Sequence, residues 1–187
     1  LLKRDGKKLE MVATDGRPGL EVRPLGGYSP VDVDARRIRR IVSNLVGNAI
    51  EHGEGRTIVV SIDSNASAVA ISVRDWGIGM TANDVDHVFD RFWRADPSRK
   101  RTLGGTGLGL AIAQEDAAVH GGTVEAWSRP GEGSNFRLTL PRSEGITTFM
   151  SPLPLIPDDV VVEGGDPQAT GGWLRRPFRR TRREKRR

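Results

Sequence analysis

The sequence predicts an α/β domain, in which helices and strands share one core. Apolar residues recur at helical spacing through residues 34–52, and a second helix follows the glycines of residues 104–109. Two pairs of alternating runs are typical of β-hairpins, at 57–63 with 68–74 and at 123–128 with 134–140. A chain of 187 residues is long enough for one such core with tails.

Residues 1–30 are predicted to be a lead-in to this domain. Residues 9–13 favour a first edge strand, and glycines and prolines between residues 16 and 27 indicate turns. Residues 31–33 favour a short strand directly before the first helix.

Asp34 opens the clearest helix, which Gly53 and Gly55 end. Its core face consists of Ile38, Ile41, Val42, Leu45, Val46 and Ala49. Asn44 and Asn48 lie four apart along one flank, with Glu51 a turn further on. Asparagine is a poor helix former, so these amides either serve a ligand or are ordinary flank amides in solvent.

The strand at 68–74 ends at Asp75, which Gly77 and Gly79 follow. An acid at a strand end predicts a carboxylate at the mouth of a pocket, and the glycines would leave room for a flat ligand against the backbone. A purely structural turn is the alternative interpretation.

Thr81 and Asp84 form a capping-box pattern that starts a short helix. Phe89 and Phe92 are three apart, so we expect both to face the same way, toward the core. Residues 94–102 are polar and basic, which indicates a mobile loop whose cations could meet phosphates. A solvated charge run would have the same sequence.

Glycines alternate at positions 105, 107 and 109 and run into the second helix. A helix start offers unpaired N–H groups and the positive end of a dipole, which suits phosphate; a tight turn is the equal alternative. The segment matches neither the Walker nor the Rossmann pattern. The expected core face of the helix is Leu108, Ala111, Ile112, Ala118 and Val119, and His120–Gly122 end it.

Charge is concentrated in the C-terminal part of the chain. Residues 142–187 contain ten basic and six acidic side chains, which leaves the rest close to neutral within a net charge of +5. A nucleic-acid partner is therefore not expected. The absence of cysteine excludes disulfides and agrees with a reducing compartment. The sequence contains no run of about 18 apolar residues, so no membrane span is predicted.

Four segments occur in an informative order, namely 44–49, 75–79, 89–92 and 105–110. Together they resemble the N box, first glycine box, phenylalanine box and second glycine box of the catalytic domain of bacterial sensor histidine kinases, of the GHKL type. The resemblance covers residues 31–141. It implies a two-layer α/β (α+β) sandwich of the Bergerat type, with a mixed sheet covered on one face by about three helices and ATP held under a lid at about 93–105.

The resemblance also implies roles by position. Asn48 would bind Mg²⁺ through its amide oxygen, and Asp75 would accept a hydrogen bond from adenine, with Gly77 and Gly79 giving the ring space. Phe89 and Phe92 would anchor the lid, and Arg94 would lie near the phosphates as a catalytic cation. The remaining nucleotide contacts would come from His52, Gly105, Thr106, Gly107, Leu108 and Gly109.

Asn44 separates two kinds of relative. In similar ATP sites that hydrolyse ATP, such as those of DNA gyrase and the large heat-shock chaperone, a glutamate four residues before the metal asparagine acts as base for water. An amide cannot take that proton, so the resemblance favours a kinase over a hydrolysing ATPase or a nucleotide-binding module without transfer, with Asn44, Asn48 and Arg94 as its catalytic residues.

The phosphate acceptor is missing from this sequence. His52, His87 and His120 do not stand in the setting of the family's phosphorylated helix, and His120 is interpreted as structural. We therefore expect a dimerisation domain upstream of Leu1 in a homodimeric inner-membrane parent, a cytoplasmic location for this part, and a response regulator as partner. Glu51, where many relatives carry lysine, and Asp116, on an apolar face, depart from the family pattern.

Residues 142–187 lack periodicity and are rich in proline, glycine and acids, which predicts disorder. Their last fifteen residues hold nine basic side chains. A solvated tail is the plainest interpretation, and contact with an anionic membrane surface through Trp173 and Phe178 is the next.

Overall fold

The computed structural model describes residues 2–5, 8–11, 19–26, 30–95, 106–143 and 145–160. Its strands form one seven-stranded sheet in the order β1-β2-β3-β4-β5-β7-β6. The strands are β1 (Leu2–Asp5), β2 (Lys8–Met11), β3 (Leu20–Pro24), β4 (Ile58–Ser64), β5 (Ala68–Asp75), β6 (Thr123–Arg129) and β7 (Gly133–Pro141). Only β3 and β4 pair in parallel, so the sheet is mixed.

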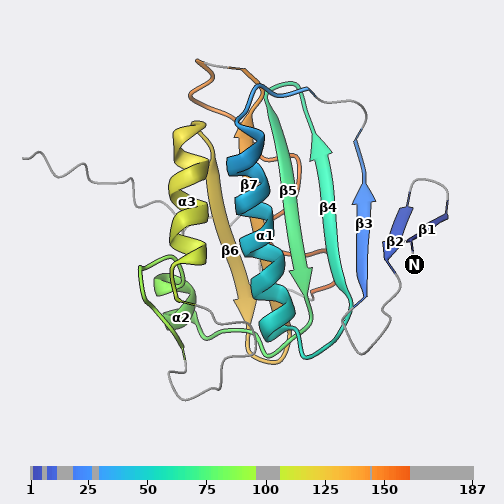
Figure 1. The fold of residues 1–187 in the computed structure, drawn as a ribbon, viewed down its shortest axis with the longest axis vertical. Coiled ribbons are helices and arrows are strands. Elements are labelled where there is room, and N and C mark those ends of the chain that lie inside the picture. Colours follow the sequence, from blue (N-terminus) through green and yellow to red (C-terminus); the bar gives the residue numbers. More distant parts are fainter. Residues whose placement is uncertain are drawn as a thin grey trace, which may run out of the picture. The chain divides into compact units, whose positions relative to one another are not determined.

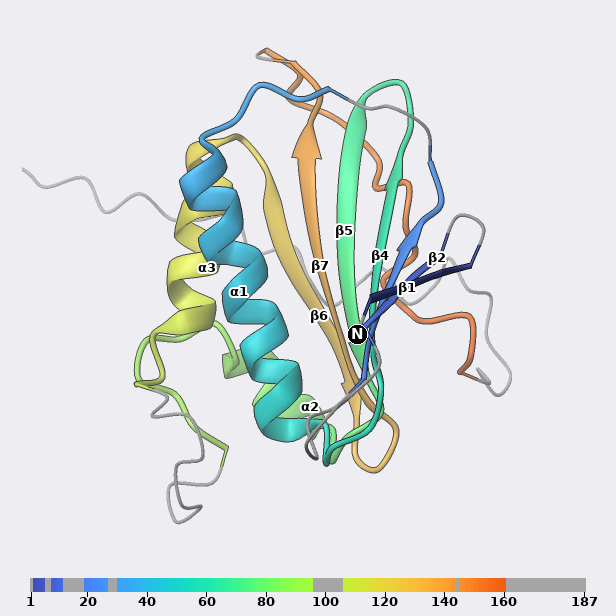
Figure 2. The ribbon, with the colours of Figure 1, turned by 45° about the vertical axis from the view of Figure 1, so that its right-hand side comes forward.

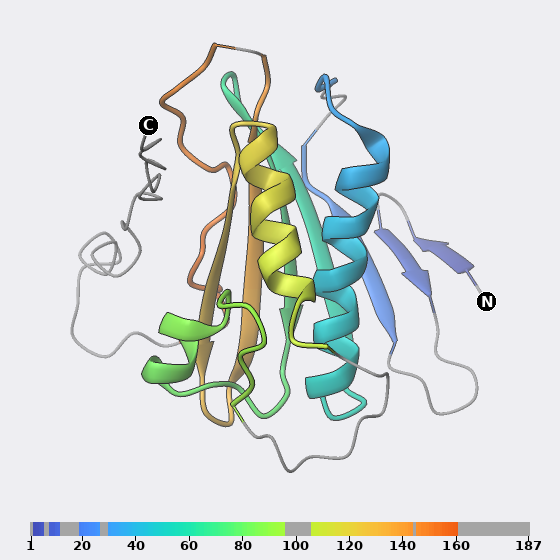
Figure 3. The same cartoon turned by 60° about the vertical axis from the view of Figure 1, so that its left-hand side comes forward.

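Three helices lie on one face of this sheet (Figure 1). They are α1 (Ala35–His52), α2 (Ala82–His87) and α3 (Gly109–Val119). Figure 3 shows α1 and α3 side by side, with α2 at the lower end of the sheet. The two-layer α/β sandwich that the resemblance implied is confirmed. Among the described residues, no helix has both the length and the apolar character needed to cross a membrane.

The first helix begins and ends as its sequence predicts. The Asp34 side chain accepts hydrogen bonds from the backbone N–H groups of Arg36 and Arg37, at 2.8 and 3.4 Å, and Gly53 is the C-cap. The predicted strand at 31–33 is wrong, because these residues form the coil that leads into the N-cap. The strand predicted at 9–13 overlaps β2, but β2 pairs with both β1 and β3, so it is not the edge strand that was predicted. The sequence does not predict β3, because its surroundings are rich in turn residues.

The core lies between the helices and the sheet. The fully buried face of α1 packs on α3 and on the inner side chains of the central strands. One row of this core crosses four strands and consists of Val60, Val73, Phe136 and Ala126. Because side chains alternate along a strand, the neighbours of these residues point to the opposite, outer face.

Residues 146–157, called the strap here, run across that outer face, away from the helices (Figure 2). The Asn135 amide donates to the carbonyl of Leu155 at 2.8 Å, and the Arg137 guanidinium donates to that of Leu153 at 2.6 Å. The Leu153 side chain is 5% exposed. The structure thus differs at residues 146–157 from the disorder predicted for 142–187, because sheet side chains bond to carbonyls of the strap. Residues 161–187, with the basic cluster, lie outside the described residues.

Candidate functional site

Asp75 ends β5 with its carboxylate on the helix side of the sheet. The side chain is 1% exposed, and its Oδ1 accepts hydrogen bonds from the N–H groups of Gly77 at 3.0 Å and Ser134 at 3.3 Å. Oδ2 is buried and has no hydrogen-bond partner among the described residues. A buried carboxylate oxygen without a donor is costly, so this geometry suits a ligand that brings an N–H group.

Two effects of opposite sign act on the Asp75 carboxyl. Burial raises its pKa, while the hydrogen bonds from Gly77 and Ser134 and the positive charges of Arg74 and His52 lower it. Burial is the largest effect, so the pKa lies above its usual value.

Gly77 and Gly79 are required by backbone packing. A Cβ on Gly77 would lie 1.9 Å from the carbonyl oxygen of His52, and one on Gly79 would lie 1.8 Å from that of Arg129. Gly79 also has a φ of 66°, which favours glycine. Protein backbone thus lies where a side chain at either position would point, and the placing of a flat ring against this loop stays a prediction.

Asn44 and Asn48 lie on the α3 side of α1 in different settings. The Asn44 amide donates to the carbonyl of Gly109 at 2.8 Å, so it ties α1 to the first turn of α3. The half-buried Asn48 has no recorded hydrogen-bond partner among the described residues. One amide is thus used within the fold, and the other is available to a ligand.

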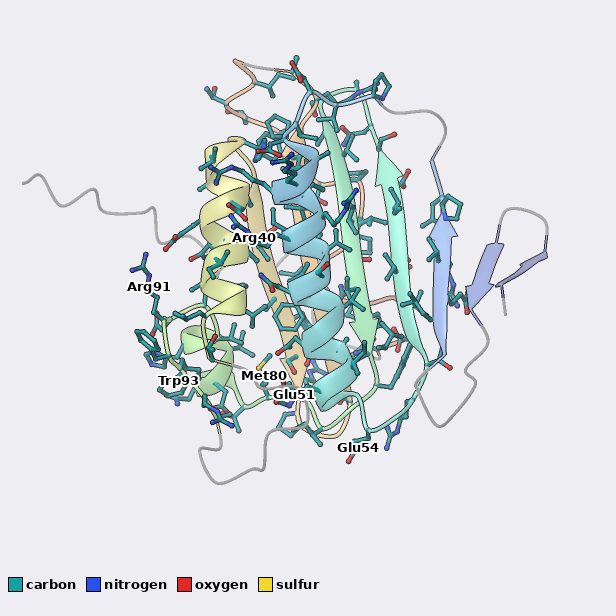
Figure 4. All side chains as sticks on the ribbon, in the orientation of Figure 1. Arg40, Glu51, Glu54, Met80, Arg91 and Trp93 are labelled. Carbon is teal, nitrogen blue, oxygen red and sulfur yellow. The ribbon has the colours of Figure 1, made fainter. Side chains whose placement is uncertain are left out.

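The end of α1 contributes two further predicted residues to the same end of the sheet. The His52 carbonyl accepts the N–H of Ile78 at 3.2 Å, which holds the loop after β5 against α1. Glu51 of α1 and Met80 of that loop lie at this lower end (Figure 4). Glu51 is half-buried, so a carboxylate stands where many relatives carry lysine.

The segment after α2 separates the two phenylalanines. Phe89 packs edge-on against Phe136, with ring centroids 6.4 Å apart, whereas Phe92 is 71% exposed with a φ of 65°. The expectation that both face the core is wrong, because α2 ends at His87 and helical spacing no longer applies. Arg94 is half-buried.

Backbone contacts join the two ends of the predicted lid. The N–H of Phe92 donates to the carbonyl of Gly107 at 2.8 Å, and a Cβ on Gly107 would lie 3.0 Å from the Phe92 backbone. Arg91 also forms an ion pair with Glu115 of α3. The segments on either side of the predicted lid are thus joined, while Gly105 and the other residues of 96–105 lie outside the described residues.

The N-terminal turn of α3 faces the flank of α1. Leu108 is the N-cap without a side-chain hydrogen bond, Gly109 begins the helix, and exposed Thr106 precedes them. A Cβ on Gly109 would lie 3.4 Å from the Asn44 side chain. The first turn of a helix leaves backbone N–H groups without intrahelical partners, and such groups can bind phosphate, so phosphate binding at this turn stays a prediction.

The buried face of α3 differs from the predicted one. Its buried residues are Ala111, Ala113, Asp116 and Ala117, while Ala118 and Val119 are exposed. Asp116 is 2% exposed and accepts hydrogen bonds from Arg37 at 2.8 Å and from Nε and Nη2 of Arg40, each at 2.6 Å. The bonds from Arg40, then Arg37, lower the pKa of Asp116. The sequence had left solvent exposure and an arginine pair as alternatives for this residue.

His120 has a structural role, as its place at a helix end predicts. Its Nε2 accepts the N–H of Asp34 at 3.0 Å, and its Nδ1 lies 2.8 Å from the carbonyl oxygen of Asp116. The ring thereby links the end of α3 to the start of α1, far from Asp75. Sequence reasoning missed this network because its partners are 76 to 86 residues apart.

Comparisons with known proteins agree with this arrangement. Residues 33–144 match the model of the family described as histidine kinase-, DNA gyrase B-, and HSP90-like ATPase. The sensor histidine kinase MtrB of Mycobacterium tuberculosis is 52% identical over 126 residues, which are 67% of this chain and 22% of that protein. WalK of Bacillus subtilis is 45% identical over 117 residues, 61% of this chain and 19% of that protein. The chain thus spans about a fifth of these relatives.

Solved structures show the same fold. Full-length ShkA, crystallised in complex with AMPPNP, has a TM-score of 0.58 and 27% identity, covering 65% of this chain and 25% of that one. The mycobacterial sensor histidine kinase MprB has a TM-score of 0.55 and 26% identity, covering 65% of this chain and 83% of that one.

Proposed function

Because the chain belongs to the family of histidine kinase-, DNA gyrase B-, and HSP90-like ATPases, we propose that it binds ATP with Mg²⁺ and transfers the γ-phosphoryl group to a histidine of a dimerisation domain. One observation carries the proposal. Asp75, buried at the end of β5, keeps one carboxylate oxygen without a donor on the helix side of the sheet.

Asp75 recognises the base in this proposal. Adenine carries an exocyclic amino group, which can donate to Oδ2, while Oδ1 stays bound to Gly77 and Ser134. A guanine or hypoxanthine ring has a carbonyl oxygen at that position, and an oxygen facing a carboxylate is repulsive. The site therefore selects adenine, because a base without that amino group leaves the buried Oδ2 without a hydrogen-bond donor.

The N-terminal turn of α3 and Asn48 receive the phosphates and the metal. The described residues contain no cluster of three or more His, Cys, Asp or Glu that could hold a metal ion by itself. A single amide oxygen from Asn48 together with phosphate oxygens and water suits Mg²⁺, which rarely has an all-protein cage. When bound, the ion neutralises charge that develops on the transferred phosphoryl group.

Transfer is favoured over hydrolysis by Asn44. Its amide has no basic site for a water proton and already donates to the Gly109 carbonyl, so it positions the first turn of α3. During transfer the bond from the γ-phosphorus to the ADP oxygen breaks and a bond to the acceptor histidine nitrogen forms. Of the proposed catalytic residues, Asn44 thus acts through α3, whereas Asn48 and Arg94 would face the phosphates.

The partners follow from this reaction. The acceptor histidine belongs to a dimerisation domain of a homodimeric parent, and a response regulator takes the phosphoryl group from it. We place the domain on the cytoplasmic side of an inner-membrane sensor kinase, where ATP is available. Contact of the basic C-terminal residues with an anionic membrane surface remains a prediction about residues outside the described ones.

Mixing the 187-residue chain with γ-labelled ATP, Mg²⁺ and a separately produced dimerisation domain tests the proposal. We expect label on the acceptor histidine and its loss when that histidine is replaced by glutamine. An Asn44→Glu variant introduces a base for water and removes the donor to the Gly109 carbonyl, so we expect less label on the histidine and more free phosphate. Free phosphate as the main product of the unaltered chain would support a hydrolysing ATPase, and binding without either product would support a sensing module.

A further inference from the structure

The outer face of the sheet carries a buried cation directly behind Asp75. This inference rests on the proposed function of Asp75. We infer that Arg74 is a positioning residue for adenine recognition. From the face opposite the nucleotide it holds the backbone at the end of β5, so that the Asp75 carboxylate stays oriented toward the adenine amino group.

Hydrogen bonds define the position of Arg74. Its Nη1 donates to the carbonyl of Asp75 at 2.8 Å and to that of Ser134 at 3.4 Å. Asp75 and Ser134 are paired across β5 and β7, and the Ser134 N–H donates to the Asp75 carboxylate. One guanidinium therefore contacts the backbone on both sides of the pair that carries and orients the carboxylate.

Two tryptophans fix the guanidinium in place. Its central carbon lies 4.9 Å from the ring centroid of Trp76 and 5.2 Å from that of Trp127. Arg74 is only 7% exposed, and cation–π contacts gain strength when the cation is desolvated. Because a planar guanidinium between two rings has little freedom, the carbonyls that it contacts are held with it.

The strap supports the same row of residues. Arg74, Asn135 and Trp127 lie opposite one another on β5, β7 and β6, so they share the outer face. Asn135, which lies between the other two, donates to the strap at Leu155. Arg74 therefore belongs to a packed layer of side chains on the outer face and is not a solvated surface arginine.

Arg74 also acts on Asp75 through its charge. Among the described residues, Arg74 behind the carboxylate and His52 of α1 are charged groups that lower the pKa that burial raises. The Arg56 guanidinium also lies nearby, since it donates to the carbonyl of Trp76. Removing the Arg74 charge therefore raises the Asp75 pKa further, so a larger fraction of the carboxyl is protonated at a given acidic pH. A protonated carboxyl loses acceptor capacity toward the adenine amino group, and ADP affinity should then fall at a higher pH than in the unaltered chain.

The test compares ADP with inosine diphosphate, which lacks the amino group, by calorimetry with Mg²⁺ between pH 5 and pH 8. For the unaltered chain we expect a preference for ADP of roughly tenfold or more, the effect of one charge-assisted hydrogen bond. Arg74→Met should abolish most of this preference and shift the acidic loss of ADP affinity to higher pH. Arg74→Lys keeps the charge, so it should retain the pH midpoint while losing part of the preference.

Arg129→Met is the matched control. Arg129 lies over the same Trp127 ring at 5.8 Å but has no recorded bond to Asp75 or Ser134, so both readouts should stay unchanged. A general loosening of the fold would weaken both nucleotides equally. An unaltered ADP preference in the folded Arg74→Met and Arg74→Lys proteins, together with an unaltered pH midpoint in Arg74→Met, would overturn the inference alone. Failure of the unaltered chain to bind ADP would overturn the proposed function.

Discussion

Replacing Asp116 by asparagine should destabilise the domain without touching the nucleotide site. The carboxylate receives three charge-assisted hydrogen bonds, one from Arg37 and two from Arg40, at 2.6 to 2.8 Å. Removing one partner of a fully buried ion pair costs about 3–5 kcal/mol. Because the Arg37 and Arg40 side chains are 42% and 53% exposed, they can regain water, and we expect a loss of about 2 kcal/mol.

Urea unfolding followed by circular dichroism measures this loss. With a typical m-value for a small domain, about 2 kcal/mol lowers the urea midpoint by roughly 1 M. Glu115→Gln is the matched control. Glu115 is the neighbour of Asp116 on α3, and its carboxylate pairs with Arg91 at the exposed surface, so the substitution should change the midpoint far less. Equal midpoints for the Asp116→Asn and unaltered proteins would refute a stabilising role of the network.

The same pair of proteins gives a pH dependence with a defined sign. The hydrogen bond from Arg40 holds the pKa of folded Asp116 below its ordinary value. The carboxylate therefore contributes its stability above the unfolded pKa of about 3.9 and loses it as the pH falls through the lower folded value. The stability difference between the two proteins should be constant near neutral pH and shrink below about pH 4.

Three further substitutions test the fold and the metal assignment. Gly79→Ala should lower the free energy of unfolding by more than about 1 kcal/mol, because φ is 66° and the new Cβ would meet a carbonyl oxygen at 1.8 Å. In the same urea assay Gly47→Ala in α1 should be neutral or stabilising, because a Cβ there has no heavy atom within 4 Å. Leu153→Ala should cost about 2 kcal/mol or more if the strap stays docked in solution, while Met150→Ala, at 80% exposure, should cost almost nothing; equal effects would contradict docking. Asn48→Ala should reduce ADP affinity in calorimetry when Mg²⁺ is present and leave the affinity in EDTA unchanged; full-strength binding of Mg-ADP would refute the metal role.

Local signals predicted most of the regular elements. Asp34 caps α1, Thr81 and Asp84 form the predicted capping box, and the turn at Asn65 joins the predicted hairpin. Each of these depends on contacts within a few residues, which a sequence displays directly. The four motifs then placed these elements in one fold.

Long-range contacts account for what the sequence left open. Nothing near Asp116 in the sequence shows that two arginines of α1 reach it, and the buried face of α3 includes Asp116 while Val119 is exposed. The sequence of the strap has no helical or strand periodicity. Its position depends on residues distant in the sequence, such as Arg137 of β7, which donates to a strap carbonyl. Composition alone therefore resembles disorder there.

The candidate site shows the same division. The position of Asp75 at a strand end was predictable. The sequence does not show that Ser134, 59 residues away, bonds to Oδ1 together with nearby Gly77, or that Oδ2 is buried without a donor among the described residues. The spacing of Phe89 and Phe92 does not predict the exposure of Phe92, because α2 ends at His87 and residues three apart no longer share a face after it.

A crystal structure of the chain with Mg²⁺ and AMPPNP tests the assignment of the nucleotide site. We expect the adenine amino group within hydrogen-bond distance of Oδ2 of Asp75, the phosphates at the first turn of α3, and the metal on the Asn48 amide oxygen. A nucleotide bound elsewhere, with Oδ2 of Asp75 still lacking a donor, would contradict the proposed site.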